Sequence, residues 1–331
     1  MSTGRPLLVI GSANMDLVVT SDRLPKPGET LLGHRFLTFS GGKGANQAVA
    51  ASRAGGRVAM IGRVGADEFG RNLIRDLSLS EVDTSGLKVV DEPTGVALII
   101  TDAAGENVIV VAPGANQLLD AAAIDEVMPT MTCVTHVLAQ LETSISGVVR
   151  AAQIARDLGA VFILDPAPAR PLPPELLALT DWITPNEQEA KSLLGWTSGP
   201  FDPFDAVRAL QAWGPRNVIL KMSSKGAILL TRDGGPMHIP AMPVSAVDST
   251  AAGDTFNGAF AVALAEGREP ALAVEFAGAA AALSVTKRGA QASMPVRADI
   301  DAMVAGHSGD ERRLGRETLT GSVRGPEESL R

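Results

Sequence analysis

The feature that most constrains the fold of this chain is a regular alternation of short apolar runs with longer amphipathic stretches. The runs are apolar at successive positions, which is typical of strands buried on both faces of a parallel sheet. They are Leu7–Ile10, Val58–Ile61, Thr135–Leu138, Val161–Leu164, Trp182–Thr184 and Val218–Leu220. The stretches between them predict helices at Gly44–Arg53, Glu68–Leu79, Ser144–Leu158, Asn186–Leu194 and Asp205–Trp213. This order indicates an α/β fold with helices on both faces of the sheet, and ligand sites beyond the carboxyl ends of the strands.

Two segments interrupt this alternation because each has a strand pattern with no helix inside it. One is Glu29–Phe39, and the other is Thr94–Val111, which turns at Asp102–Glu106. Strands joined as hairpins do not fit a parallel sheet. Together with Leu17–Thr20 they predict a small antiparallel sheet, a lid, beside the main body, and ordinary edge strands are the alternative.

The same patterns predict the domain organisation. We expect one α/β domain over residues 1–304, with the lid built from about residues 14–20, 29–40 and 94–112. After Ala305 the chain becomes polar and rich in glycine, and it loses its apolar periodicity. A disordered tail over residues 305–331 is therefore predicted.

Composition excludes several classes of function. Hydrophobic residues make up 45% of the chain, enough for a large core, and 29 basic against 37 acidic side chains give a net charge of −8. That balance argues against binding to nucleic acid or to an anionic membrane, and no apolar run is long enough to span a bilayer. The single cysteine, Cys133, has no intramolecular disulfide partner, and the N-terminal residues lack a leader pattern. A cytoplasmic protein is therefore predicted.

The most informative motif is Asp248–Ala259 (DSTAAGDTFNGA), where small residues precede a predicted helix from near Gly253 to about Leu264. Such a turn presents free backbone N–H groups at the positive end of the helix dipole, which suits a phosphoryl group. Asp254 lies in the first helical turn, where aspartate is common as a cap. A carboxylate beside an anion site is also placed to accept a hydroxyl proton during phosphoryl transfer. The residues alone leave both interpretations open.

Polar residues also follow the first predicted strand and precede the first predicted helix. Asn14 and Asp16 come directly after Leu7–Ile10 and suit either a turn or a polyhydroxylated ligand. The segment Ser40–Gln47 (SGGKGANQ) leads into a helix and puts Lys43 and Asn46 on one helix face. Its glycines fit a ligand-binding loop and a tight connection equally well.

A fourth motif, Thr184–Glu189 (TPNEQE), lies where a predicted strand ends and a helix begins. Asn186 and Glu189 have the spacing of a helix capping box. The same two side chains would also suit hydrated magnesium and the phosphates of a nucleotide. The choice between these two roles stays open at this point.

Other chemistries lack their sequence signatures. The four histidines are scattered, without the paired spacing of a zinc site. No serine lies in a GxSxG elbow, which argues against a serine hydrolase. The segment Gly62–Gly70 does not match the GxGxxG fingerprint of a dinucleotide fold.

In combination, these segments resemble the ribokinase family of PfkB-type carbohydrate kinases. The resemblance runs from about Leu8 to Val304, and its most specific elements are Gly41–Gln47 (GGKGANQ) and Asp248–Ala259. Supporting stretches are Thr94–Ile100 (TGVALII), Asp165–Arg170 (DPAPAR), Ile183–Glu187 (ITPNE) and Lys287–Gln291 (KRGAQ). The fold it implies is a ribokinase-like three-layer α/β sandwich with a mostly parallel central sheet and a small β-sheet lid.

The resemblance implies a reaction in which ATP phosphorylates the 5-hydroxyl of D-ribose. Asp254 would be the base, and backbone N–H groups of Ala251, Ala252 and Gly253 would form the anion hole. The implied sugar contacts are Asn14, Asp16, Gly42, Lys43, Asn46, Ala97, Ile99, Glu142 and Asp254. Because Asp254 lies at a helix N-terminus, we expect its pKa to be lowered.

The resemblance also implies the nucleotide and cation sites. The residues for ATP, with Mg²⁺ bridging its phosphates, are Asn186, Glu189, Lys221, Ser223, Gly226, Gly253 and Gly278. Ser223 departs from the family pattern, which commonly has glycine at this position. An activating potassium ion would be held by Asp248, Thr250, Ser284, Lys287, Gly289 and Ser293. A role for Asp248 in bracing the loop is the alternative.

A homodimer formed through the lid is a further implication of the resemblance, because apolar lid strands need cover. Three functions stay open on the sequence. They are phosphorylation of ribose, phosphorylation of a related acceptor such as deoxyribose, another sugar or a nucleoside, and sugar binding without catalysis. The last is disfavoured because Asp254 and the small residues before it are all present.

Overall fold

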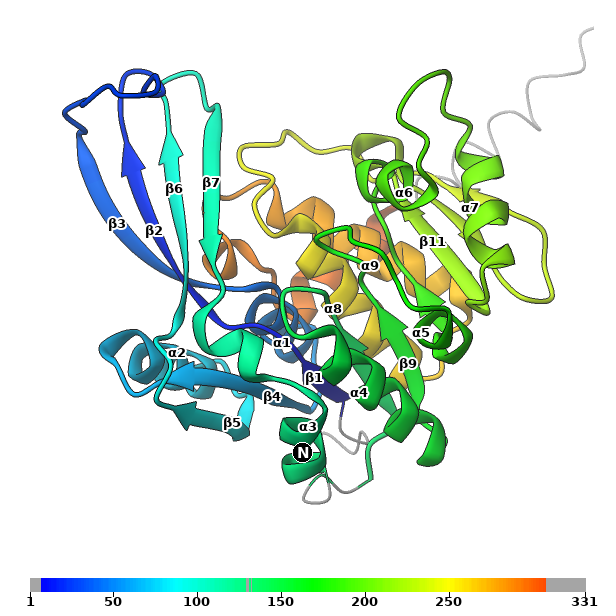
Figure 1. Cartoon of the computed structure of the whole chain (residues 1–331). Coiled ribbons are helices and arrows are strands. Elements are labelled where there is room, and N and C mark those ends of the chain that lie inside the picture. The colour runs from blue at the N-terminus through cyan, green and yellow to red at the C-terminus, as the bar shows by residue number, and fades with distance from the viewer. Residues whose placement is uncertain (1–6, 129–130, 132, 308–331) are drawn as a thin grey trace, which may run out of the picture.

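The computed structural model describes residues 7–128, 131 and 133–307, and it consists of a large sheet between two layers of helices and a smaller sheet that projects from them (Figure 1). The large sheet has the strand order β13-β12-β11-β10-β9-β8-β1-β4-β5. Its strands are β1 (Leu7–Ile10), β4 (Val58–Gly65), β5 (Asp83–Val90), β8 (His136–Ala139), β9 (Val161–Leu164), β10 (Trp182–Ile183), β11 (Asn217–Lys221), β12 (Ala227–Leu230) and β13 (Met237–Ile239). The seven neighbouring strands β5, β4, β1, β8, β9, β10 and β11 pair in parallel, whereas β12 is antiparallel to both of its neighbours.

Alternating side chains of each strand divide the core into two hydrophobic clusters, one on each face of the sheet. In β1, Leu7 and Val9 belong to one cluster, and Leu8 and Ile10 belong to the other. The first cluster packs against α1 (Lys43–Arg53), α2 (Glu68–Leu79), α8 (Ala252–Ala265) and α9 (Pro270–Ser284). The second packs against α3 (Ala121–Val127), α4 (Ile145–Asp157), α5 (Pro174–Leu179), α6 (Glu187–Leu194) and α7 (Pro203–Ala212). The three-layer sandwich expected from the sequence is confirmed.

The smaller sheet, the lid, has the strand order β3-β2-β6-β7 and stands away from the body at the left of Figure 1. Its strands are β2 (Asn14–Thr20), β3 (Arg35–Gly41), β6 (Gly95–Thr101) and β7 (Asn107–Ala112). The chain passes from β1 into β2 through three residues, so the main sheet and the lid are joined at the carboxyl end of a central strand. The expectation that the lid is antiparallel was wrong in one pairing, because β2 and β6 run parallel. They belong to different chain segments and need no hairpin between them.

The first predicted lid segment was too long, since β3 begins at Arg35 rather than Glu29. Glu29 is instead part of a turn: its backbone N–H donates to Lys26 O at 3.0 Å, and its carboxylate pairs with Arg23. These bonds fold the preceding proline-containing segment back on itself. Strand pairing therefore starts only after the turn is complete.

The other predicted elements agree with the structure to within a few residues. The main omissions were β5, β12 and β13, which lie at the two edges of the large sheet, and the helices α3, α5 and α9. The edge strands β5 and β13 are partly exposed, so they lack the continuous apolar run that identifies a buried strand, whereas β12 is apolar and buried throughout and its omission has no such reason. Residues 297–307 are helical, which extends the folded domain a few residues past the predicted boundary at 304. The remainder of the predicted tail, residues 308–331, lies outside the described residues. Among the helices described, none is long and apolar enough to cross a membrane.

Candidate active site

The carboxyl ends of the central strands meet at one edge of the sheet, beneath the lid, and polar residues gather there. Asn14 begins β2 just after β1, Gln140 follows β8, and Asp165 follows β9. Lys221 ends β11, and its ammonium forms an ion pair with Asp165 at 3.2 Å. All four side chains are buried or nearly so.

Asp254 lies at the centre of this cluster, in the first turn of α8. It is 5% exposed, and its Oδ2 accepts a hydrogen bond from Asn46 Nδ2 at 3.0 Å, while its Oδ1 accepts one from Gln47 Nε2 at 3.0 Å. The helix cap is Ala251, which makes no side-chain capping bond. The capping interpretation of Asp254 is therefore wrong: its carboxylate is bound to α1, not to its own helix.

Burial raises the pKa of Asp254 from 3.8 to about 6. The Lys43 ammonium and the two amide donors oppose this rise, and the charge of Asp165 adds to it. The sequence-based expectation of a lowered pKa was wrong in sign. A helix N-terminus stabilises a carboxylate by about 0.3–1 kcal/mol, which is less than the cost of removing the charge from water at this site.

Asp16 and Glu142 place two more carboxyl groups beside Asp254. Burial, together with the charges of Glu142 and Asp254, raises the pKa of Asp16 to about 7. Glu142 Oε2 accepts from Ser12 Oγ at 2.5 Å and from the Lys43 backbone N–H at 3.0 Å. Lys43 supplies a positive charge beside these carboxyl groups. The charges of Asp254, Asp165 and Glu142 raise its pKa, so its ammonium stays protonated.

The turn between the lid and α1 brings the lid strands close to this cluster. Gly42 caps α1 with φ +88°, and a Cβ at this position would lie 2.6 Å from the backbone N of Asn14. Glycine is therefore needed for both the backbone angle and the close approach. On the lid, Ala97 pairs with Asp16 across the β2–β6 ladder, and Ile99 lies two residues farther along the same face. The residues predicted for a sugar site are thus brought together by β2, α1, β6 and the segment after β8.

On the other side of the α8 N-terminus lies a cavity of about 460 Å³, bounded by β11, β12, α8 and α9. Five of the seven predicted nucleotide residues line it, namely Lys221, Ser223, Gly226, Gly253 and Gly278, whereas Asn186 and Glu189 are not part of its wall. A Cβ on Gly253 would lie 3.6 Å from Lys221 Nζ, so the Lys221 ammonium is close to the start of α8. Apolar side chains such as Ile239, Phe256 and Val274 form much of the remaining wall. A pocket of this size, with one cationic end and an apolar wall, suits a nucleotide.

Two residues near this cavity have backbone angles that favour glycine. Ser223 has φ +53°, in the short η3 turn (Ser223–Lys225), and Ala251 has φ +58° at the α8 cap. The left-handed backbone at Ser223 explains why a glycine would suit this position. Strain of this kind is common where a turn is shaped to bind a ligand.

Asn186 and Glu189 form the predicted capping box in full. Asn186 Oδ1 accepts from the Glu189 N–H, and Glu189 Oε2 accepts from the Asn186 N–H, each at 2.8 Å. Asn186 also bridges to Lys221 through the sheet, and burial raises the pKa of Glu189 against the opposing charge of Lys221. The structural role is confirmed, and the Glu189 carboxylate also interacts electrostatically with Lys221 and Asp165.

The predicted cation residues fall into two loops that the structure ties together. Asp248 Oδ1 accepts from the Thr250 N–H and hydroxyl, and Oδ2 accepts from the Gly289 N–H at 2.8 Å. Burial alone would raise the pKa of Asp248, but these donors outweigh it and lower the pKa. The hydroxyls of Ser284 and Ser293 donate to Ala281 O and Ala290 O, and the Lys287 N–H donates to Ser284 O. Asp248 therefore braces the loop, and this role is compatible with a cation because a carboxylate has about four acceptor sites.

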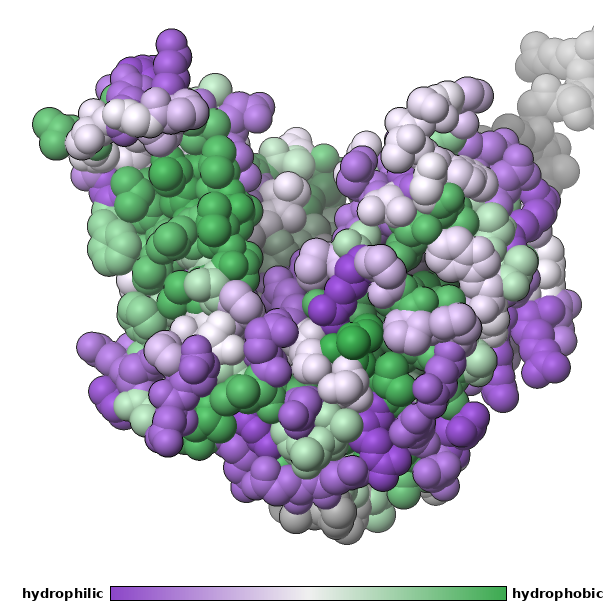
Figure 2. Space-filling view, in the orientation of Figure 1, coloured by the Kyte–Doolittle hydropathy of each residue, from purple (hydrophilic) through white to green (hydrophobic). Residues whose placement is uncertain are grey.

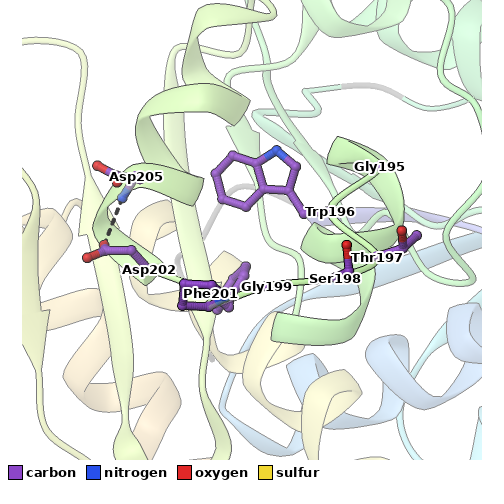
Figure 3. Close-up of a pocket in the computed structure, with 9 residues that line it drawn as sticks. Gly195, Trp196, Thr197, Ser198, Gly199, Phe201, Asp202 and Asp205 are labelled. Carbon is purple, nitrogen blue, oxygen red and sulfur yellow. Dashed lines mark hydrogen bonds between the residues drawn. The ribbon is translucent and has the colours of Figure 1, made fainter.

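A second cavity, of about 360 Å³, lies between α6 and α7 (Figure 3). It is lined by Trp196 and Phe201, whose ring centroids are 6.1 Å apart, and by Asp202. The Asp202 carboxylate caps α7 by accepting from the N–H groups of Phe204 and Asp205. No residue singled out in the sequence lies here, so we take the cluster around Asp254 as the candidate active site.

Comparison with known proteins identifies the family of this chain. Residues 5–297 match the profile described as pfkB family carbohydrate kinase. The chain belongs to this family.

Among its curated pfkB relatives, the ribokinase of Haemophilus influenzae is 43% identical over 88% of this chain and 96% of its own length. The deoxyribokinase of Salmonella typhi is 38% identical over 87% of this chain and 95% of its own length. Among solved structures, Arabidopsis thaliana ribokinase complexed with ribose and ATP superposes with a TM-score of 0.82. It is 34% identical, and the match covers 91% of this chain and 99% of that one.

Three polar residues at the centre of this pfkB site were given no role in the sequence analysis. They are Gln47, Gln140 and Asp165, all buried and hydrogen-bonded to one another or to Asp254. A signal for two of them was present, because Gln140 and Asp165 each follow a buried strand directly, as Asn14 does. Extending the rule of carboxyl-end residues to every parallel strand would have found both.

Proposed function

We propose that this chain transfers the γ-phosphoryl group of ATP to the 5-hydroxyl of D-ribose and releases ADP and D-ribose 5-phosphate. The observation that carries the proposal is the position of Asp254. A buried carboxylate with a pKa of about 6 separates a polar cluster under the lid from a nucleotide-sized cavity. The kinship with ribokinases, one of them solved with ribose and ATP, supports the same assignment.

The polar cluster under the lid binds the sugar. Asn14, Asp16, Lys43, Asn46 and Glu142 supply amide, ammonium and carboxylate groups, a set suited to the donor and acceptor pattern of sugar hydroxyls. The backbone at Gly42 forms the floor of the site. Ala97 and Ile99, on the lid face shared with Asp16, close over the less polar side of the ring. Closure of the lid excludes water and so limits wasteful hydrolysis of ATP.

Asp254 accepts the proton of the 5-hydroxyl as the sugar oxygen forms its bond to the γ-phosphorus. The bond between that phosphorus and the oxygen bridging to the β-phosphate breaks, and the electron pair leaves with ADP. A base with a pKa of about 6 is ionised at neutral pH and still basic enough to take the proton. Backbone N–H groups of Ala251, Ala252 and Gly253 stabilise the charge on the transferred group, and that of Ala252 exchanges its 3.2 Å bond to Ser249 O for this contact.

ATP occupies the cavity beside α8, with its phosphates toward Lys221 and Gly253 and its base against the apolar wall. Ser223, Gly226 and Gly278 shape that pocket. Asn186 and Glu189 fit a role toward hydrated Mg²⁺, because Glu189 is a carboxylate held rigidly by the capping box. When bound, Mg²⁺ neutralises phosphate charge during transfer.

A potassium ion beside the anion hole completes the proposal. The fit rests on the donor set: the Asp248 and Gly289 loops are joined by a 2.8 Å hydrogen bond, and they offer carboxylate, hydroxyl and carbonyl oxygens. Asp248 and Thr250 come from one loop, and Ser284, Lys287, Gly289 and Ser293 from the other. Hard oxygen ligands of this kind suit an alkali cation, whose bound charge would favour the anion hole.

A second copy of this chain is the proposed cover for the lid. Apolar lid residues are widely exposed, and they gather over the lid in the space-filling view (Figure 2). Leu98 and Val110 pair on one face, whereas Ile109 and Val111 are exposed on the other, so both lid faces have exposed apolar residues. Leu98→Glu with Val110→Glu should convert a dimer to a monomer in sedimentation. The control Leu272→Glu, at an exposed site on α9, should not.

The reaction takes place in the cytoplasm in this proposal, since it consumes ATP and the lone cysteine, Cys133, is free. The catalytic unit is the α/β domain with its lid. The second candidate function is phosphorylation of deoxyribose, favoured by the similarity to a deoxyribokinase.

The decisive experiment measures ADP release by the purified protein with Mg²⁺–ATP. Ribose, deoxyribose, fructose and adenosine are compared as acceptors, each in potassium and in sodium alone. Fast turnover with ribose that rises with potassium supports the proposal. Preference for another acceptor reassigns the substrate, and ribose binding without turnover would favour a sugar-binding regulator. The Asp254→Asn variant serves as the inactive control.

A further inference from the structure

The amide of Gln47 links two buried carboxylates at the candidate active site. Its Nε2 donates to Asp254 Oδ1 at 3.0 Å and to Asp165 Oδ2 at 2.8 Å. Gln47 is fully buried, and Asp165 is 2% exposed, so water does not compete for these positions. A carboxylate has about four acceptor sites, so Asp254 keeps capacity for a substrate hydroxyl after these bonds are made.

The two carboxylates and a second glutamine together fix the direction of this amide. Gln140 Nε2 donates to Gln47 Oε1 at 2.6 Å, and Gln140 is also fully buried. If the Gln47 amide turned over, its carbonyl oxygen would face the carboxylates of Asp165 and Asp254, and its N–H₂ would face the donor of Gln140. Acceptor would then face acceptor, and donor would face donor, at every contact. The Gln47 amide therefore has one favourable direction, and Gln140 follows it through one hydrogen bond, since Gln140 Oε1 is buried without a partner among the described residues.

We propose that Gln47 and Gln140 are positioning residues for Asp254, with Gln140 orienting the Gln47 amide and Gln47 holding one oxygen of the catalytic carboxylate. The inference deepens the proposed function and rests on the role assigned there to Asp254. Neither glutamine was among the residues expected to contact the sugar or the nucleotide. Their action on the reaction is indirect.

The consequence concerns the charge of Asp254. Lys43 on α1 favours its ionised form, and Asp165 after β9 and Asp16 on β2 oppose it. Gln47 supplies a donor between Asp254 and Asp165, where two like charges would otherwise face each other. Loss of one hydrogen bond to a charged group corresponds to a pKa change of about 1–2 units. Removal of the Gln47 amide should therefore raise the pKa of Asp254 into the neutral range.

The test compares Gln47→Met and Gln140→Met, each of which keeps the length of the side chain and removes the amide. The double variant completes the cycle. The control is Thr180→Val, which removes another buried hydrogen bond, to Leu176 O, away from this cluster. Melting temperature is measured for each protein to establish that it is folded.

The primary readout is the pKa of Asp254 itself, followed through the ¹³C shift of its carboxyl group and assigned with Asp254→Asn. The expected result is a rise of about 1–2 units in Gln47→Met and a smaller rise in Gln140→Met. Adding Gln140→Met to Gln47→Met should change nothing further. The control should leave the pKa in place. This readout needs no turnover, so it tests the positioning even if the acceptor is misassigned.

The kinetic readout is the pH profile of ribose phosphorylation. Its acid limb should move to higher pH by the same amount, with kcat at pH 7 lowered about two- to tenfold and the KM for ribose changed less than about threefold. An unchanged pKa in folded Gln47→Met or Gln140→Met would overturn the proposal. Additive effects in the double variant would overturn the relay between the two glutamines. Absence of ADP release by the wild-type protein would count against the proposed function instead.

Discussion

Replacing Asp254 with asparagine should separate function from stability in this protein. The substitution keeps the size of the side chain but removes both the base and a buried negative charge. Ionisation of Asp254 is unfavourable in the folded state, since its pKa is raised from 3.8 to about 6. That difference of about 2 pKa units corresponds to about 3 kcal/mol of stability lost when the group is ionised.

Asparagine brings a cost of its own. Both oxygens of Asp254 accept an amide N–H, from Asn46 and from Gln47. An asparagine offers one oxygen and one N–H₂, so one of the two donors would lose its acceptor, at about 1–3 kcal/mol. The two effects offset each other. At pH 8 the Asp254→Asn protein should be between equally stable and about 2 kcal/mol more stable than wild type.

The sign of the pH dependence follows from the raised pKa. Wild-type Asp254 contributes no ionisation penalty below pH 3.8, where it is protonated in both states, and the full penalty above about pH 6. The variant lacks this term at every pH. The stability of the variant relative to wild type should therefore improve by about 2–3 kcal/mol between pH 4 and pH 8.

Turnover of the Asp254→Asn protein should fall, although its stability does not. Loss of a general base typically lowers rate by 10²- to 10⁴-fold, so kcat should fall in that range while ribose binding stays within a few-fold. Urea denaturation at pH 4 and pH 8 measures stability, ADP release measures turnover, and calorimetry measures ribose binding. Asp120→Asn is the matched control, because Asp120 is a true cap that accepts from the Ala123 N–H. It should leave turnover and ribose binding unchanged.

The reasoning is refuted if Asp254→Asn is destabilised by more than about 2 kcal/mol at pH 8 while losing ribose binding and turnover together. Asp254 would then be a structural residue. Retention of more than a tenth of wild-type turnover would remove it as the base.

Three further predictions follow from the same geometry. The pH profile of kcat/KM should have an acid limb with a midpoint between about 6 and 7, set by Asp254 and Asp16, and a midpoint near 4 would contradict the raised pKa values. Glu142→Gln removes a charge that raises the pKa of Asp16, so the acid limb of ribose binding measured by calorimetry should move to lower pH. Affinity at pH 7 should still fall about tenfold, because Glu142 is itself a proposed sugar contact and a hydrogen bond to a charged group is worth about 1.5–3 kcal/mol. An unmoved limb would mean that the two carboxyls do not interact. Ser223→Gly relieves a left-handed backbone at φ +53° but adds chain entropy, so stability in urea should change by less than about 1 kcal/mol. The KM for ATP should stay within about threefold, whereas a tenfold increase would show that the Ser223 hydroxyl contacts the nucleotide.

The sequence predicted the central sheet well because its strands are buried on both faces. A run such as Leu7–Ile10 or Val161–Leu164 has no amphipathic alternative, so its state and its bounds are set locally. The capping box of Asn186 and Glu189 was predicted for a similar reason, since it joins residues three apart. Partly exposed β5, in contrast, carries no comparable signal and went unpredicted.

The lid shows where local pattern stops being sufficient. Alternation identified most of β6 and β7, but the parallel pairing of β2 with β6 joins segments far apart in the chain. Nothing in either segment specifies the direction of its partner. The exposure of apolar residues on both lid faces also depends on what the sheet leaves uncovered.

By itself, the sequence determined the α/β class, the order of elements, and the motifs that carry the candidate site. Such features depend on burial patterns and short-range geometry that each segment holds alone. The pKa of Asp254 was decided by the tertiary structure alone. The helix that bears it predicts a lowered pKa, whereas its burial among residues from α1 and from the ends of β8 and β9 raises it. Gln47, Gln140 and Asp165 acquire their relation to that carboxylate in the same way, because a desolvation cost and a hydrogen-bond network arise only when distant segments close around one group.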